Sequence, residues 1–220
     1  MLGARERNRL AWQQLMSQLG VPQETGWQWW QTVDTHYSEG PRSYHTHEHI
    51  ADMLQQLTAM QPPPCKPALL TLAIFFHDVI YDPMSGTNEE DSAALYTTFA
   101  AAITQEASDA QLVSDYIIAT KTHSSSPATA DSNLAALLDL DLAVLGRPRE
   151  GYQQYASQIR REYSFVPAAE YCSKRAAVLR QLAAAPALYR TQHFATTHEA
   201  RARENLAAEI AQLERGDIPQ

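Results

Sequence analysis

The chain has 220 residues, of which 45% are apolar, and it carries a formal net charge of -8. The apolar content is enough for a substantial core, which argues against disorder, and the length suits one compact domain or two small ones. An acidic chain lacks the basic surface that nucleic-acid-binding proteins use, so we do not expect a nucleic-acid polymer as partner.

Apolar residues recur at helical spacing along nearly the whole chain, with no pair of alternating β-branched runs and no internal repeat. Prolines, glycines and helix-start residues mark the ends of the segments. We expect a first helix that ends at Gly20, then an aromatic-rich helix through Trp27, Trp30 and Val33, then a helix in the histidine segment. Further helices are expected over residues 68–81, from residue 87 onward, and over 107–121, 131–146 and 151–163. The last two are the alanine-rich stretch between Pro167 and Pro186 and residues 197–215. Since no linker divides these segments, we predict an all-α fold, a single compact helical domain over residues 1–220.

Three features predict a cytoplasmic protein with no disulfide, no signal peptide and no membrane contact. Cys65 and Cys172 lie far apart in the sequence and lack metal-type spacing. The first ten residues are polar and charged. The most apolar run, Ala68–Tyr81, is too short to span a bilayer and contains His77 and Asp78, so we expect a buried core helix.

Three of the eight histidines lie in the segment Tyr44–Asp52, which reads YHTHEHIAD. On a strand all three rings would face one way, whereas on a helix His45 and His49 share a face and His47 points elsewhere. The residues that follow are good helix formers with apolar positions at helical spacing, so we predict a helix. Two histidines four residues apart are weak evidence alone, because such pairs also occur on ordinary surfaces.

His77 and Asp78 lie near the end of a helix that is apolar on nearly every side. Burying ionisable groups costs several kcal/mol unless they are paired or bound to a metal. A hydrogen-bonded pair inside the core and a pair of metal ligands are equally good interpretations.

Two acidic residues lie in the predicted helix 131–146. Asp141 lies on its apolar stripe, whereas we predict Asp139 on a smaller, outer face. A carboxylate on the core face needs a partner, which is either an arginine such as Arg160 or Arg175 or a metal ion. Taken in order, a histidine, a His-Asp pair and an aspartate on three helices suit Zn, Fe, Mn or Ni and leave positions open for water.

This order, His49, His77-Asp78 and Asp141, resembles that of the HD-domain metal-dependent phosphohydrolases. Residues 44–53 are also similar to the YHNxxHxxDV motif of the HD-like cyclic-nucleotide phosphodiesterases, although Thr46 stands where that motif has asparagine. The chain further resembles a bacterial group of predicted HD-superfamily phosphohydrolases through segments between residues 44 and 209, namely YHTHEHI, AIFFHDVIYDP, NEEDSA, ATKTH, DLDLAVLG, IRREY and ARENLAAE.

The resemblance implies an HD-like domain whose metal-binding core covers about residues 42–146, with flanking helices at both ends. One or two divalent ions (Mn, Mg, Zn, Fe, Ni or Co) would be held by His49, His77, Asp78 and Asp141, and Asp78 could bridge a pair of ions. The implied reaction is hydrolysis of a phosphate ester, a nucleotide or other small phosphorylated metabolite, by hydroxide formed from metal-bound water. His45 would act as the general acid or would orient His49.

Four further residues are candidates for the same site. Arg42 and Lys121 could hold a substrate phosphate, or could equally be solvated surface residues. Glu89 and His123 could serve a second metal or its bound water, or could simply complement the ends of their helices.

Two other functions remain alternatives: an HD-like di-iron oxygenase, for which His45 and His123 would be additional ligands, and a catalytically silent nucleotide-binding module. The tryptophans near Trp27 and Trp30 suit either a core or the interface of a homo-oligomer.

Overall fold

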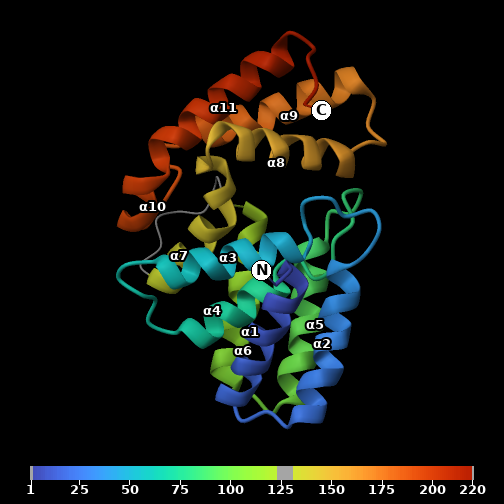
Figure 1. Cartoon of the computed structure of the whole chain (residues 1–220), viewed down its shortest axis with the longest axis vertical. Helices are drawn as coiled ribbons and strands as arrows, with labels where there is room; N and C mark the ends of the chain where they lie inside the picture. The colour runs from blue at the N-terminus through green and yellow to red at the C-terminus, as the bar shows by residue number, and fades with distance from the viewer. Residues whose placement is uncertain (1, 123–130, 220) are drawn as a thin grey trace. The chain divides into compact units, whose positions relative to one another are not determined.

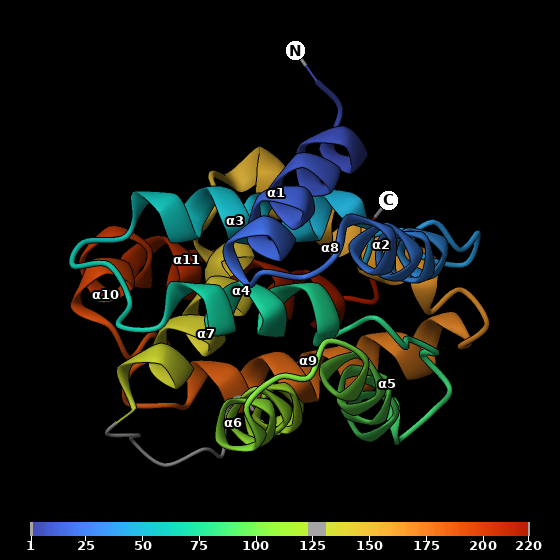
Figure 2. The same cartoon turned by 90° about the horizontal axis from the view of Figure 1, so that it is seen from below.

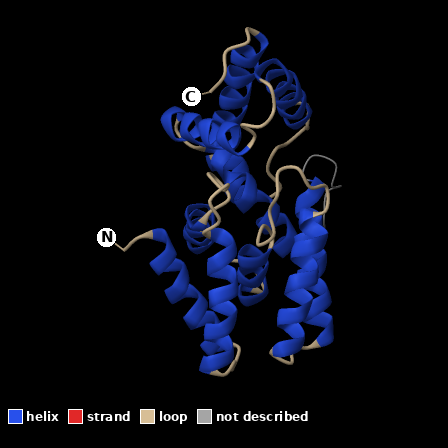
Figure 3. Cartoon of the chain, turned by 90° about the vertical axis from the view of Figure 1, so that its right-hand side faces the viewer, coloured by secondary structure: helices blue, strands red, loops and turns tan. Residues whose placement is uncertain are grey.

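The computed structural model describes residues 2–122 and 131–219. Within these ranges the chain contains eleven α-helices, two short 3-10 helices and no strand (Figure 3), which confirms the predicted all-α fold. None of the helices in these ranges is both long and apolar enough to cross a membrane. The helices group into two units, Met1–Lys121 and Thr122–Gln220, so the single domain expected from the sequence stays a prediction.

Four helices of the first unit form two hairpins, and a fifth helix lies between them. Figures 1 and 2 show α1 and α2 side by side, α5 and α6 side by side, and α4 between these two hairpins. Helix α3 packs against α1 and α4, and α4 also packs against α5 and α6. The helices are α1 (Ala4–Gln18), α2 (Gln23–Tyr37), α3 (His47–Ala59), α4 (Pro67–Phe76), α5 (Asn88–Ala102) and α6 (Ala107–Ala119), followed by the 3-10 helix η1 (Thr120–Thr122).

Helix α4 ends earlier than the sequence predicts. Its apolar residues are buried on every side, as expected of a core helix, but it stops at Phe76 rather than continuing through residue 81. The next segment is held by α5 instead: the Ser92 hydroxyl accepts from the Ile80 N–H at 3.1 Å and donates to the Ile80 carbonyl at 3.2 Å. His77 therefore lies at the C-cap, and Asp78 lies just beyond the helix.

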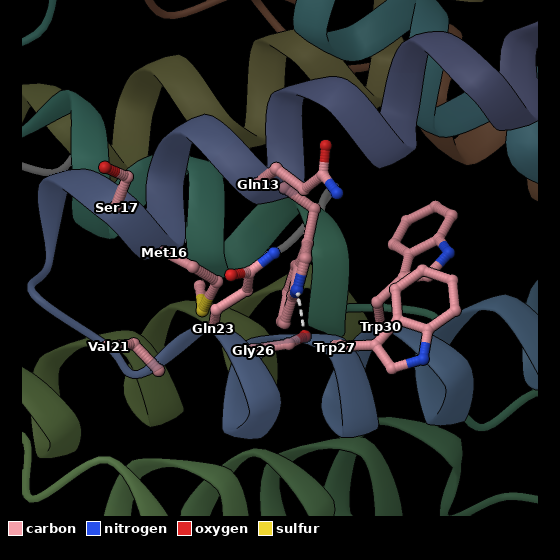
Figure 4. Close-up of a pocket in the computed structure, with 9 residues that line it drawn as sticks. Gln13, Met16, Ser17, Val21, Gln23, Gly26, Trp27 and Trp30 are labelled. Atoms are coloured by element: carbon pink, nitrogen blue, oxygen red, sulfur yellow. Dashed lines mark hydrogen bonds between the residues drawn. The ribbon is translucent and has the colours of Figure 1, made fainter.

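Trp12 on α1 is the centre of the aromatic core of this unit and is 1% exposed. Its ring and the Phe75 ring on α4 pack in a T-shaped arrangement, with 5.2 Å between the ring centroids. Its Nε1–H donates to the Gly26 carbonyl at 2.8 Å and so joins α1 to α2 (Figure 4). A hollow of about 440 Å³ lies beside this bond, between Trp27 and Met16, and no predicted site residue lines it.

The second unit has a different plan, in which the last helix packs on several others. Helix α11 contacts α9, α10 and the 3-10 helix η2, and α8 also packs on η2. Its first helix begins where the sequence predicts, because the Asp131 carboxylate accepts from the N–H groups of Asn133 and Leu134. Its elements are α7 (Ser132–Leu142), η2 (Ala143–Gly146), α8 (Arg149–Glu162), α9 (Ala168–Ala183), α10 (Gln192–Thr197) and α11 (Glu199–Glu214).

A buried polar group joins α8, α9 and α11. Glu209 is 3% exposed, accepts a short hydrogen bond from the Tyr152 hydroxyl, and accepts from Arg175 Nε at 3.0 Å. Burial raises the pKa of Tyr152, so that its hydroxyl stays protonated and able to donate. The buried carboxylate is thus balanced by one cation and one hydroxyl.

Candidate metal centre

The histidine segment is only in part helical. Thr46 is the N-cap of α3, and its hydroxyl oxygen accepts from the Glu48 N–H at 3.3 Å, so the helix begins at His47 and His45 lies in the preceding turn. The prediction that His45 belongs to the helix is therefore wrong. The turn nevertheless places the rings of His45 and His49 near each other, with centroids 5.9 Å apart.

His47 points away from this pair, as predicted. Its Nδ1 lies 3.3 Å from Asn8 Nδ2, and the same amide nitrogen donates to the His47 carbonyl at 2.8 Å. Because an amide nitrogen only donates, His47 Nδ1 accepts and its Nε2–H donates to Asp34 Oδ1 at 3.0 Å. Burial lowers the pKa of His47, which favours this neutral ring. His47 thus joins the start of α3 to α1 and α2.

His77 has one ring nitrogen committed to the backbone. Its Nδ1 lies 2.9 Å from the Ile74 carbonyl, which can only accept, so this nitrogen carries a proton. In the neutral ring, Nε2 then presents its lone pair on the opposite side. A backbone hydrogen bond of this kind fixes the orientation of a histidine that binds a metal.

The Nε2 atom of His77 faces two other groups. It lies 3.1 Å from His49 Nε2 and 3.1 Å from Asp78 Oδ2. The Asp78 oxygen also lies 3.8 Å from His49 Nε2 and 3.9 Å from His45 Nε2. Both His49 and His77 are buried, at 2% and 1% exposure. The first unit therefore contains a buried histidine–aspartate cluster.

The chemistry of this cluster fits a cation. A lone pair and a carboxylate oxygen 3.1 Å apart repel each other unless a proton or a metal ion lies between them. Two ligand atoms at about 2.0–2.1 Å from one ion would be roughly 2.9 Å apart at a right angle and roughly 3.4 Å apart at the tetrahedral angle. The two 3.1 Å separations lie inside that range, whereas the 3.8 Å between His49 Nε2 and Asp78 Oδ2 is longer and would shorten on binding one ion. His49, His77 and Asp78 could therefore hold a metal ion together.

Arg42 is buried rather than solvated. Its side chain is 1% exposed, and its guanidinium donates to the carbonyls of His45, Asp78 and Val79 at 3.2, 2.7 and 2.8 Å. These contacts favour a role in holding the backbone of the cluster over the predicted contact with substrate.

Lys121, on η1, lies beside Glu89 and Glu90 in the first turn of α5. Lys121 Nζ donates to the Gly86 carbonyl at 2.7 Å and to Glu90 at 2.5 Å, and it lies 4.0 Å from Glu89. The hydrogen bond with Glu90 raises the pKa of Lys121. The roles predicted for Lys121 and Glu89 stay predictions, and His123 lies outside the described residues.

The two aspartates of α7 differ from the prediction. Asp139, which we predict on an outer face, is fully buried, and its carboxylate accepts from the N–H groups of Arg190 and Thr191 and from the Thr191 hydroxyl at 2.7–3.0 Å. That part of the prediction is wrong, because the donors come from a loop some 50 residues further along the chain. Asp141 is half-buried.

The arginines considered as partners for Asp141 have other contacts. Arg175 pairs with Glu209, and Arg160 donates to the carbonyls of Tyr163 and Val166 at 2.7 and 3.0 Å. Both arrangements lie within the second unit.

Some residues around the cluster could not be identified from sequence. The Tyr81 ring lies 4.2 Å from that of His45, between ring centroids, and Asp34 and Asn8 hold His47. Asp34 and Asn8 lie in no motif, and Tyr81 lies in the segment AIFFHDVIYDP without being singled out there.

No protein-family model, curated protein or solved structure matches the chain significantly. The likeness to the HD-domain phosphohydrolases is therefore carried by the motifs and by the cluster. What is established is an all-helical chain with a buried histidine–aspartate cluster that could bind a metal.

Proposed function

We propose that the chain is a metal-dependent phosphohydrolase, which cleaves a phosphate ester of a nucleotide or of another small phosphorylated metabolite. The observation that carries this proposal is the approach of His49 Nε2, His77 Nε2 and Asp78 Oδ2 to one another inside the first unit. A mixed imidazole and carboxylate set suits Mn, Zn, Fe, Ni or Co, and three ligands leave positions for water and substrate.

Asp141 is the proposed fourth ligand. Support comes from the position of Asp141 in the sequence order, after His49 and His77-Asp78. A fourth protein ligand would complete a cage that is part imidazole and part carboxylate.

A divalent cation bound there would lower the pKa of a coordinated water toward about 7. The Ile74 carbonyl accepts from His77 Nδ1 and so keeps His77 Nε2 directed at the centre. His45 is 19% exposed in its side chain and lies 3.9 Å from Asp78 Oδ2, which places a titratable group at the edge of the site. We assign it the transfer of a proton to the leaving oxygen.

The test is a screen of metals against substrates. The purified chain is loaded separately with Mn, Mg, Zn, Fe, Ni or Co and assayed on nucleotides and on generic phosphate mono- and diesters. Wild type should hydrolyse at least one class, and Asp78→Asn should lose at least 100-fold in rate. The matched control is Asp115→Asn, since Asp115 is an exposed aspartate on α6 of the same unit.

Three results would overturn the proposal. Equal activity of wild type and Asp78→Asn would remove the centre. Oxygen uptake by the iron-loaded protein, without hydrolysis, would indicate an oxygenase. Tight nucleotide binding with no turnover under any metal would indicate a silent binding module.

A further inference from the structure

Arg42 combines a full charge with almost complete burial. Its guanidinium lies over the rings of Tyr37 and Tyr81, at 5.1 and 5.5 Å from their centroids, and Nε donates to Glu39 Oε2 at 3.1 Å. Burying a cation is costly unless its donors are satisfied. Solvation at the surface therefore does not explain why a charged residue occupies this position.

The remaining donors join two segments that are distant in sequence. Nη1 donates to the carbonyls of His45 and Asp78, and Nη2 donates to the carbonyl of Val79. One guanidinium thus holds the turn before α3 and the chain just after α4. A planar fork with fixed donor directions can do this, whereas a single ammonium cannot reproduce its geometry.

These bonds leave little for a substrate. Four of the five N–H groups are used: one at Nε, two at Nη1 and one at Nη2. The side chain is 1% exposed, so a phosphate would have to displace the protein to reach it. Backbone carbonyls beyond a helix C-terminus also lack helical partners and attract cations.

We infer that Arg42 is a positioning residue of the metal centre: it fixes the backbone of Asp78 and of His45, so that their side chains meet at the site of His49 and His77. The inference rests on the proposed metal centre. The carbonyl of Asp78 is held by Arg42 while its Oδ2 faces the two histidines, so a shift of this backbone moves a ligand directly.

The test measures metal affinity rather than turnover. Mn²⁺ binding is followed by titration calorimetry, and the Co²⁺ absorption spectrum reports ligand geometry. Arg42→Lys keeps the charge, Arg42→Ala removes the side chain, and Arg9→Ala is the control at a half-buried arginine of α1 paired with Glu6. Circular dichroism and unfolding curves of all variants check the fold.

We expect Arg42→Lys to weaken Mn²⁺ binding by about tenfold to 100-fold and to alter the Co²⁺ spectrum, because loss of such supporting contacts has that effect. Arg9→Ala should bind as wild type does. Added methylguanidinium should partly restore metal affinity to Arg42→Ala, which a general loss of stability would not predict.

A folded Arg42→Lys with metal affinity within twofold of wild type would overturn the inference. So would an Arg42→Ala that methylguanidinium does not improve. Wild-type protein that binds no metal would instead refute the proposed function. If wild-type protein binds metal but hydrolyses no ester, the phosphohydrolase proposal fails, and the metal affinities of the Arg42 variants still test the positioning role.

Discussion

His49 and His77 face each other through their Nε2 atoms, which lie 3.1 Å apart. The other nitrogen of His77 donates to the Ile74 carbonyl, so a neutral His77 accepts at Nε2. In the metal-free protein, a proton on His49 Nε2 can join the two rings. A bound cation would take the place of that proton and would draw in the Asp78 oxygen as well.

The first prediction concerns metal and stability. A divalent ion at about 100 times its Kd should stabilise the folded chain by about 2.7 kcal/mol, because it binds only the folded state. For a chain of this size we expect the unfolding midpoint to rise by several degrees in calorimetry and to return after EDTA. His77→Gln should show no such rise, whereas His36→Gln should keep it, since His36 pairs with nearby Glu39 and is not one of the proposed ligands. Equal responses of the two variants would contradict the prediction.

The second prediction separates two aspartates that lie two residues apart. Asp139→Asn should destabilise the protein by roughly 2–4 kcal/mol in urea unfolding. The asparagine amide has one acceptor oxygen in place of two, whereas the buried carboxylate now accepts from two backbone N–H groups and one hydroxyl. Asp141→Asn should change metal-free stability by less than about 1 kcal/mol while lowering metal affinity. The opposite pattern would exchange the assigned roles.

The third prediction is a pH dependence at Asp34. Hydrogen bonds from Arg5 hold the pKa of Asp34 below its ordinary value, and His47 adds to this. Because the folded-state pKa is lowered, the carboxylate stabilises the protein above its unfolded-state pKa of about 3.9, and this contribution is lost as pH falls through the folded-state value. Asp34→Asn should therefore cost about 1 kcal/mol near pH 7, a modest figure since Arg5 is largely exposed.

Unfolding of wild type and Asp34→Asn at several pH values checks this. The free energies of unfolding of the two proteins should approach each other as pH falls below 4. A difference that stays constant down to pH 2 would show that the side chain acts through packing instead.

The fourth prediction uses a buried tyrosine of the second unit. Burial raises the pKa of Tyr171 from 10.0 to about 12. The neutral hydroxyl is therefore favoured in the folded state, and stability present below pH 10 is lost as pH rises toward 12, by roughly 2–3 kcal/mol for this group. Tyr171→Phe should lose less stability than wild type between pH 10 and 12.

At neutral pH the same substitution should be nearly neutral. The Tyr171 hydroxyl is buried and has no hydrogen-bond partner among the described residues, so its removal leaves no new orphan group. A loss above about 2 kcal/mol at pH 7 would contradict this account.

Helical periodicity and residue chemistry predicted much of this molecule. They indicated the all-α fold, the burial of His77 beside Asp78, and the different direction of His47. Each of these follows from local spacing together with the cost of burying polar groups. Such reasoning works where one helix face or one apolar run decides the outcome.

The parts that sequence did not reveal depend on distant partners. The segment after α4 is held at Ile80 by Ser92, twelve residues further on, whereas the start of α3 depends on one local hydroxyl, at Thr46. Asp139 is buried because backbone N–H groups of residues 190 and 191 meet it. Arg42 has backbone carbonyls as acceptors, and any residue type can supply those.

The most direct test of the metal centre is the stoichiometry and affinity of divalent-ion binding, measured by titration calorimetry on wild type, Asp78→Asn and Asp115→Asn. The proposed centre predicts one or two ions per chain in wild type and in Asp115→Asn, and at least 100-fold weaker binding in Asp78→Asn. Wild-type protein that binds no divalent ion at millimolar concentration, or Asp78→Asn that binds as tightly as wild type, would contradict it.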